Sequence, residues 1–98
     1  MSLVKKQWEF TRAVSKLIAY AEFIGYVLTF GDVYAKTGHK SGSFHYKRLA
    51  VDFNLFINNE YQTTTASHKP LGEYWETLGG TWGGRFDKPD GNHYSWGE

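Results

Sequence analysis

The amino-acid sequence predicts a small α+β domain, in which an N-terminal helix and a shorter second helix pack on an antiparallel sheet of about four strands. Two observations predict this class: an apolar stripe at helical spacing near the N-terminus, and later runs rich in β-branched and aromatic residues that include a hairpin signal. The length sets the size of the domain. At 98 residues the chain hides only about two-thirds of its unfolded surface, so we expect residues 1–98 to form a single domain.

The first helix is predicted from Lys5 to Gly25, with Ser2 as its cap and Gly25 as its end. Its apolar residues recur at steps of three and four, which is the stripe of a helix that packs on a sheet. They are Phe10, Ala13, Val14, Leu17, Ile18, Ala21 and Ile24.

The remaining elements follow from short patterns. Asn58-Asn59 is a turn signal that should join the strongest strand to a returning one, and Pro70 marks the start of a second helix. Six of the eleven glycines fall in residues 79–98, so this tail should be mostly loop. The predicted strands are 26–34 with a bend at Gly31, 49–56 at the sheet centre, 61–65 and 93–96; the second helix is 71–78, and 35–43 is a loop.

Composition excludes several classes of protein. With 41% hydrophobic and 21% charged residues the chain is neither disordered nor a coiled coil. The absence of cysteine excludes disulfides, thiolate zinc sites and a catalytic thiol, so a metal would need His, Asp or Glu. Without a signal segment or an apolar run of about 18 residues, we expect synthesis in the cytoplasm, no signal peptide and no stable membrane association.

Charge is unevenly distributed along the chain. Residues 1–49 carry eight basic and three acidic side chains, whereas residues 50–98 carry three basic and seven acidic ones. The net charge of +1 is too small for nucleic-acid binding through bulk charge, and the basic half lacks interleaved aromatic residues. We therefore expect no nucleic-acid partner.

Asp52 is anomalous because it interrupts the predicted central strand between Val51 and Phe53. A buried carboxylate is costly without a compensating cation. An ion pair with Lys47 or Arg48 is the simple explanation. His45 is the other candidate, but its odd separation from Asp52 would place it on the opposite face of one unbroken strand, so it must lie in a loop or bulge before the strand.

A second polar cluster is Asp90-Gly91-Asn92-His93. The glycine allows a tight turn that lets the acid and the histidine point into one site. Alone, the pattern is weak evidence for a site and is more typical of a type I turn leading into a strand.

The two clusters together are more specific, because residues 43–52 have the form S-x-H-x-x-x-x-A-x-D. With the Gly79–Gly84 segment, this arrangement resembles the zinc peptidases that include D-Ala-D-Ala carboxypeptidases and phage L-alanyl-D-glutamate endolysins, which share the hedgehog/DD-peptidase fold. The resemblance runs from about Phe10 to the C-terminus. It implies that His45, Asp52 and His93 bind zinc and that Asp90 is the general base.

The sequence departs from the family pattern at two places. Arg48 stands where glycine is common, although endolysin-like members tolerate arginine there. The family's oxyanion-stabilising arginine is missing after Tyr34, where Ala35 and Lys36 follow. The candidates for this positive charge are Lys36, His39, Lys40 and Arg48, and we favour Lys36.

The chemistry of the residues agrees with the resemblance. Two imidazoles and one carboxylate leave one position of a tetrahedral zinc open, as in catalytic sites. Zinc lowers the pKa of bound water to about 7, and Asp90 can pass its proton to the leaving amine. A metal that ties loop residues to a strand would also stabilise a small core without disulfides.

Other residues near these motifs are assigned to substrate or to packing. We expect Ser43, Tyr46, Arg48 and Trp82 to contact substrate and Tyr94 to line the cleft, although core packing is an equal alternative for Trp82. His39 and His68 are expected at the surface, and Trp8, Trp75 and Trp96 are expected to be structural.

The function implied is hydrolysis of the L-Ala–D-Glu bond in peptidoglycan stem peptides by a monomeric zinc endopeptidase, acting as a phage or prophage endolysin. Such a protein would stay in the host cytoplasm until lysis and then act in the periplasm and cell wall. Two alternatives remain: a D-Ala-D-Ala carboxypeptidase, and a non-catalytic wall-binding module with structural zinc.

Overall fold

Two helices and a five-stranded antiparallel sheet make up the computed structural model, which describes residues 2–33 and 43–97. The predicted α+β class is confirmed, but the sheet has one strand more than expected. Its order is β1-β2-β5-β4, and β3 pairs with β2. The elements are α1 (Leu3–Phe23), β1 (Val27–Phe30), β2 (Ala50–Ile57), β3 (Glu60–Tyr61), α2 (Lys69–Thr77), β4 (Thr81–Trp82) and β5 (His93–Ser95), with 3-10 helices η1 (Phe44–Lys47), η2 (Ala66–His68) and η3 (Gly83–Arg85).

Helix α1 has the predicted cap at Ser2 and the predicted terminating glycine at Gly25, but its helical residues begin at Leu3, before the predicted Lys5, and end at Phe23. The hydroxyl oxygen of Ser2 accepts a hydrogen bond from the Lys5 backbone N–H at 3.3 Å, and Gly25 follows the helix with φ +82°. The buried stripe is narrower than predicted, because Ile18 lies at its margin and keeps 36% of its surface exposed. The residues that face the sheet are Phe10, Ala13, Leu17 and Ala21.

Strand β2 is central, as predicted, and pairs with β1, β3 and β5. Asn58 and Asn59 both adopt positive φ, as a two-residue hairpin turn with the twist of the strands requires. The returning strand ends at Tyr61 instead of Thr65. Its continuation turns away because the Thr64 hydroxyl accepts a hydrogen bond from the Ser67 backbone N–H at 3.2 Å, just before η2 begins.

The remaining elements agree with the predictions to different degrees. Strand β1 is shorter than predicted and stops at Phe30, although Gly31 still donates a backbone hydrogen bond to the Asp52 carbonyl at 2.7 Å. Helix α2 and strand β5 lie where they were expected. Strand β4 was not predicted, because two residues between glycine pairs carry no strand pattern. The predicted loop 35–43 falls, apart from Ser43, outside the described residues.

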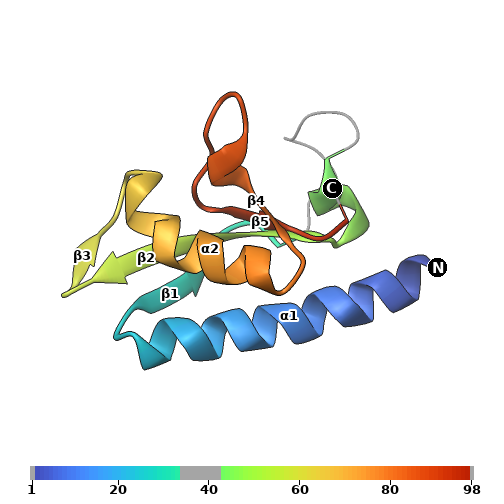
Figure 1. The fold of residues 1–98 in the computed structure, drawn as a ribbon, viewed down its shortest axis with the longest axis horizontal. Helices are drawn as coiled ribbons and strands as arrows, with labels where there is room; N and C mark the ends of the chain where they lie inside the picture. The colour runs from blue at the N-terminus through green and yellow to red at the C-terminus, as the bar shows by residue number, and fades with distance from the viewer. Residues whose placement is uncertain (1, 34–42, 98) are drawn as a thin grey trace.

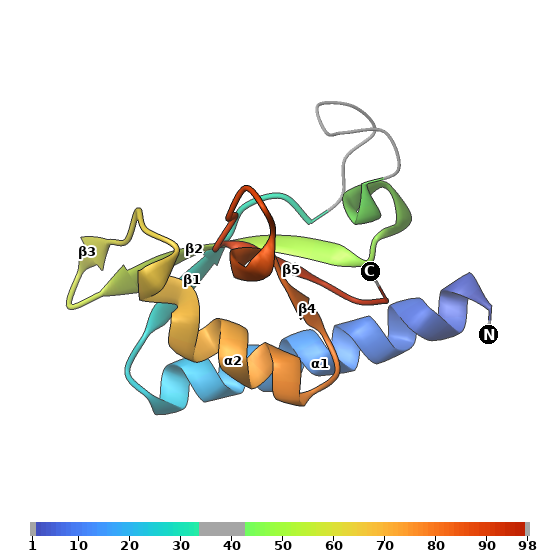
Figure 2. The ribbon, with the colours of Figure 1, turned by 45° about the horizontal axis from the view of Figure 1, so that its top comes forward.

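The two helices lie side by side against one face of the sheet (Figures 1 and 2). The loop between β4 and β5, in red, and η1, in green, stand on the side away from α1 (Figure 1). Side chains alternate along a strand, so Val51 and Phe53 of β2 face the helices, whereas Asp52 faces the loops. The sheet thus separates an apolar face from a polar one.

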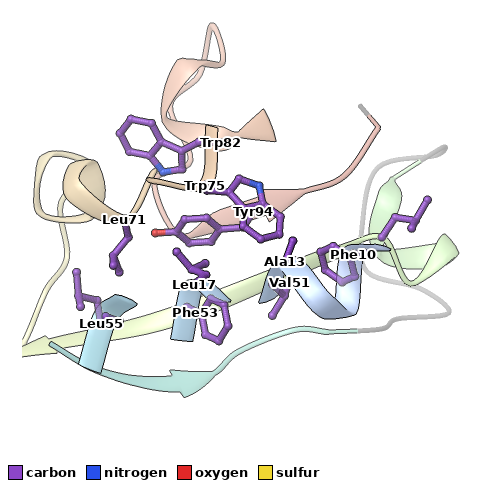
Figure 3. Packing of buried hydrophobic residues seen from close by; sticks show 12 residues of the cluster. Phe10, Ala13, Leu17, Val51, Phe53, Leu55, Leu71, Trp75, Trp82 and Tyr94 are labelled. Atoms are coloured by element: carbon purple, nitrogen blue, oxygen red, sulfur yellow. The ribbon is translucent and has the colours of Figure 1, made fainter. Parts of the chain in front are cut away.

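Large aromatic side chains fill the core between helices and sheet (Figure 3). Trp75 and Tyr94 are fully buried and pack edge to face with 6.0 Å between ring centroids. The Trp75 indole N–H donates to the carbonyl of Ser95 at 3.0 Å, which satisfies its polar atom.

The core corrects three predictions. Tyr94 lies inside it and does not line a cleft. His68 is buried instead of exposed, because its Nδ1 lies 2.8 Å from the Tyr94 hydroxyl, which gives the imidazole a polar partner below the surface. Trp8 was expected to be structural, but it lies on the outer face of α1 with 53% of its surface exposed.

Among the described residues, no helix combines the length and the apolar character needed to cross a bilayer.

We expect Leu17→Ala to lower the free energy of unfolding by about 2–5 kcal/mol, because it leaves a cavity at a fully buried position. The neighbouring Ile18→Ala removes a similar side chain from a partly exposed position and should cost less than about 1 kcal/mol. Urea denaturation of the two variants measures the difference. Equal losses would contradict the placement of α1.

Candidate metal centre

Three side chains from separate parts of the chain converge on the polar face of the sheet. One ligand atom from each of His45, Asp52 and His93 lies within 4.8 Å of the others. Oδ1 of Asp52 is 3.2 Å from Nε2 of His45 and 3.5 Å from Nδ1 of His93. Both imidazoles are buried, and the Asp52 side chain is 19% exposed.

The pairing of β2 with β5 brings Asp52 and His93 together. They are directly opposed in the antiparallel register, so their side chains leave the sheet on the same face. On the other side of Asp52, its backbone N–H donates to the carbonyl of Asp32 at 2.7 Å. The strand that carries the carboxylate is therefore held from both sides.

His45 reaches the site from η1, off the strand, as the spacing of the two residues requires. The Ser43 hydroxyl oxygen accepts a hydrogen bond from the His45 backbone N–H at 3.3 Å and caps this short helix. Arg48 ends it in the left-handed conformation, with φ 56°, and turns the chain into β2. The serine of the S-x-H pattern thus has a local structural role, which is to orient the histidine.

Gly83 allows the loop before β5 to close over His93. A Cβ atom at this position would collide with the carbonyl oxygen of Asp90 and lie 2.8 Å from Cβ of His93. The Asp90 backbone N–H donates to the Gly83 carbonyl at 2.9 Å, and the Phe86 ring lies 5.4 Å from that of His93. A glycine is therefore needed here to keep Asp90 and His93 in place.

The three side chains fit a metal ion. Oδ1 of Asp52 is buried, yet it accepts no hydrogen bond from any residue that the structure describes, although two imidazole nitrogens lie close to it. A buried carboxylate oxygen without a donor is costly unless a cation neutralises it. Two imidazoles and one carboxylate are a ligand set that zinc takes in catalytic sites. This group could therefore hold zinc.

Asp90 lies beside this group and is not part of it. It precedes His93 by one turn, because the Asp90 carbonyl accepts a hydrogen bond from the His93 backbone N–H at 3.1 Å. The residue is exposed and borders a cavity of about 220 Å³. A carboxylate at such a position can exchange protons with solvent and with a bound substrate.

The family model for D-alanyl-D-alanine carboxypeptidase, a family of zinc peptidases, matches residues 37–96 and so spans all four of these residues. The chain belongs to this family. No curated protein matches the chain. Membership confirms the resemblance seen in the sequence and gives the chain the zinc-dependent peptidase chemistry of its family.

The proposed substrate residues differ in their exposure. Arg48 is exposed at the end of η1, and Tyr46 is half-buried within that helix. Trp82 is buried, donates its indole N–H to the carbonyl of Gly91 at 2.7 Å and packs in the core, which favours the packing alternative. Lys36, like His39 and Lys40, lies outside the described residues.

The residues that enclose the cavity beside Asp90 were not predicted from the sequence. Thr63, Thr65 and His68 border it together with Asn92. The run of three threonines before His68 was the available signal, but it was assigned to a strand. Only the fold shows that this run faces the loop that carries Asp90.

We expect elemental analysis of the purified protein to find about one zinc per chain. Asp52→Asn keeps the shape of the side chain but removes its charge, and should weaken zinc binding at least about 100-fold in a chelator competition. Asp87→Asn changes an exposed acid outside the metal group and should leave affinity unchanged. Unaltered affinity in Asp52→Asn would contradict the assignment.

A comparison of Ser43 with Ser2, which caps α1, tests whether the cap of η1 positions His45. Ser43 and Ser2 each accept a backbone hydrogen bond at 3.3 Å, so replacing either with alanine should cost about 0.5–2 kcal/mol of stability. Only Ser43→Ala releases the segment that carries His45. Its zinc affinity should fall roughly tenfold, while Ser2→Ala keeps the affinity of the unmodified protein. Equal zinc affinities would show that the cap does not position His45.

Proposed function

We propose that the chain is a zinc-dependent endopeptidase of peptidoglycan that hydrolyses the L-Ala–D-Glu bond of stem peptides. The observation that carries this proposal is that His45 and His93 converge on the buried Oδ1 of Asp52. Asp90 lies one turn before His93. A purely structural zinc site has no use for the exposed carboxylate of Asp90. The non-catalytic alternative is therefore the weaker one.

Each residue has a defined part in the proposed reaction. His45, Asp52 and His93 would hold zinc. When bound, zinc would act as a Lewis acid and lower the pKa of a water molecule to about 7. Asp90 accepts the proton of the attacking water and donates it to the leaving amine. Lys36 remains our proposed source of positive charge for the developing oxyanion.

The pairing of Arg85 favours endopeptidase over carboxypeptidase action. A carboxypeptidase needs a fixed cation for the terminal carboxylate of its substrate, ideally an arginine that binds in two places. Nε and Nη2 of Arg85 instead donate to both carboxylate oxygens of Glu76 at 3.0 and 3.1 Å. This surface ion pair occupies Arg85, which makes it a poorer clamp for a substrate carboxylate than an arginine without such a partner.

The biological setting that we propose follows from the proposed substrate. The protein would act as a monomeric phage or prophage endolysin, held in the host cytoplasm until lysis and then active in the periplasm and cell wall. Peptidoglycan is the partner that the family's chemistry favours.

We expect Asp90→Asn to retain zinc while its turnover of peptidoglycan falls by roughly two or more orders of magnitude, because the amide cannot accept a proton. Turbidity loss of purified cell walls measures turnover, and elemental analysis measures zinc. Asp87→Asn, which changes an exposed acid three residues earlier in the same loop, should keep full activity. Full activity in Asp90→Asn would remove this residue from the mechanism.

Mass spectrometry of digested peptidoglycan identifies the bond that is cut. We expect stem peptides that begin with D-Glu, and glycan that retains L-Ala on its lactyl-muramic acid. Release of free D-Ala, with D-Glu still attached to the glycan, would instead establish the carboxypeptidase that the family description names.

A further inference from the structure

A polar cavity of about 220 Å³ lies next to the metal group, and the mechanism above does not use it. One wall is the segment 61–65, which begins at the last residue of β3, and the other is the loop 89–92. Phe53 and His68 also line it. Asp90 lines the cavity and its carbonyl accepts a hydrogen bond from the His93 backbone N–H, so a ligand in the cavity would lie beside the proposed base.

The two walls are fixed against each other at Gly91. A Cβ atom on Gly91 would lie 2.5 Å from Cα of Thr65, so the backbones touch at this point. On the Thr65 side, Ser67 donates to the side-chain oxygen of Gln62 at 2.8 Å and shares a hydrogen bond of 2.9 Å with the Thr64 hydroxyl. The cavity is therefore preformed, as ligand sites usually are.

The cavity offers hydrogen bonds without positive charge. None of the described residues that line it is a lysine or an arginine. Burial lowers the pKa of His68 to about 4, so its imidazole is neutral at pH 7, and the Asp90 carboxylate at the rim repels anions. Within the described part of the chain, no hydrogen bond occupies the side chains of Thr63, Thr65 or Asn92. The ligand should therefore be polar and carry no negative charge.

This property distinguishes the two sides of the proposed scissile bond. The side beyond the bond begins with D-Glu and carries carboxylates. The side before the bond has the methyl group of L-Ala and then the lactyl and N-acetyl groups of muramic acid, whose own carboxyl is consumed in the amide. Only the second side is uncharged and rich in hydroxyl and amide groups.

The size and the rim of the cavity also suit a sugar. Its volume is below the range of about 300–1,000 Å³ that drug-sized ligands occupy, so it holds one small group or ring. Tyr61 borders it with 55% of its surface exposed and is held by the Phe56 ring at 5.4 Å. An exposed tyrosine provides a flat apolar surface with a polar end, which matches the apolar face and the hydroxyls of a pyranose.

We propose that this cavity binds the N-acetylmuramoyl sugar to which the stem peptide is attached. The proposal rests on the endopeptidase function given above and adds that the enzyme recognises the glycan side of the bond. Thr65 and Tyr61 are then residues that determine specificity. Peptide already released from glycan is a poor substrate.

Two synthetic substrates that differ only in the sugar test this proposal: N-acetylmuramoyl-L-Ala-D-Glu and N-acetyl-L-Ala-D-Glu. We expect kcat/KM to be about tenfold or more higher for the first, and Thr65→Val or Tyr61→Ala to lower that preference about five- to tenfold. Thr29→Val, an exposed position on β1, should keep the preference of the unmodified enzyme.

Failure of the sugar site and failure of the endopeptidase function give different results. If both substrates are cut equally fast, the sugar site is overturned and the endopeptidase function stands. If neither is cut, the proposed function fails, and NMR titration decides the sugar site by itself. N-acetylmuramoyl-L-alanine should then shift the backbone amides of residues 62–65, 91 and 92, while N-acetyl-L-alanine should not. Absence of that difference overturns the proposal.

Discussion

A carboxylate in the middle of a central strand is the constraint on which the rest of the polar face depends. Asp52 is flanked by Val51 and Phe53, which pack against the helices, so its position in the sheet is fixed by the core and not by its own chemistry. Its buried Oδ1 then needs compensation. The strand opposite supplies His93 through the β2–β5 register, and η1 supplies His45. The geometry of the site is in this sense a consequence of how β2 is packed.

The core that fixes β2 is built from few but large side chains, and glycines make it possible. The Trp82 ring lies where a Cβ atom on Gly72 or Gly84 would be, and the Trp75 ring lies where a Cβ atom on Gly80 would be. The glycine-rich segment around β4 is therefore packed tightly against indoles and is not a loose loop. This arrangement lets a chain of 98 residues bury Trp75, Trp82 and Tyr94 at its centre and still carry a polar site on the other side of the sheet.

The loop between β4 and β5 connects the two functional regions of the molecule. Its Gly83 end lies against His93 in the metal group, and its Gly91 end lies against Thr65 in the cavity wall. Asp90 stands between these two contacts. A substrate that filled the cavity would therefore contact the same short segment that carries the proposed base. Binding of the glycan side would then act directly on the orientation of Asp90.

The helices, the central strand, the hairpin turn and the three residues of the candidate metal group were predictable from the sequence, because each depends on local periodicity, on turn residues or on a spaced motif. The sequence could not determine what depends on contacts between distant segments. Ser43 proved to be a helix cap, Trp82 and Tyr94 core residues and His68 a buried imidazole, and β4 and the cavity went unpredicted. Burial is decided by which segments meet, and only the tertiary structure brings the threonines of 63–65 against Gly91. A hydroxyl, an indole or an imidazole has the same sequence pattern whether it is buried or exposed, so the fold alone decided these roles.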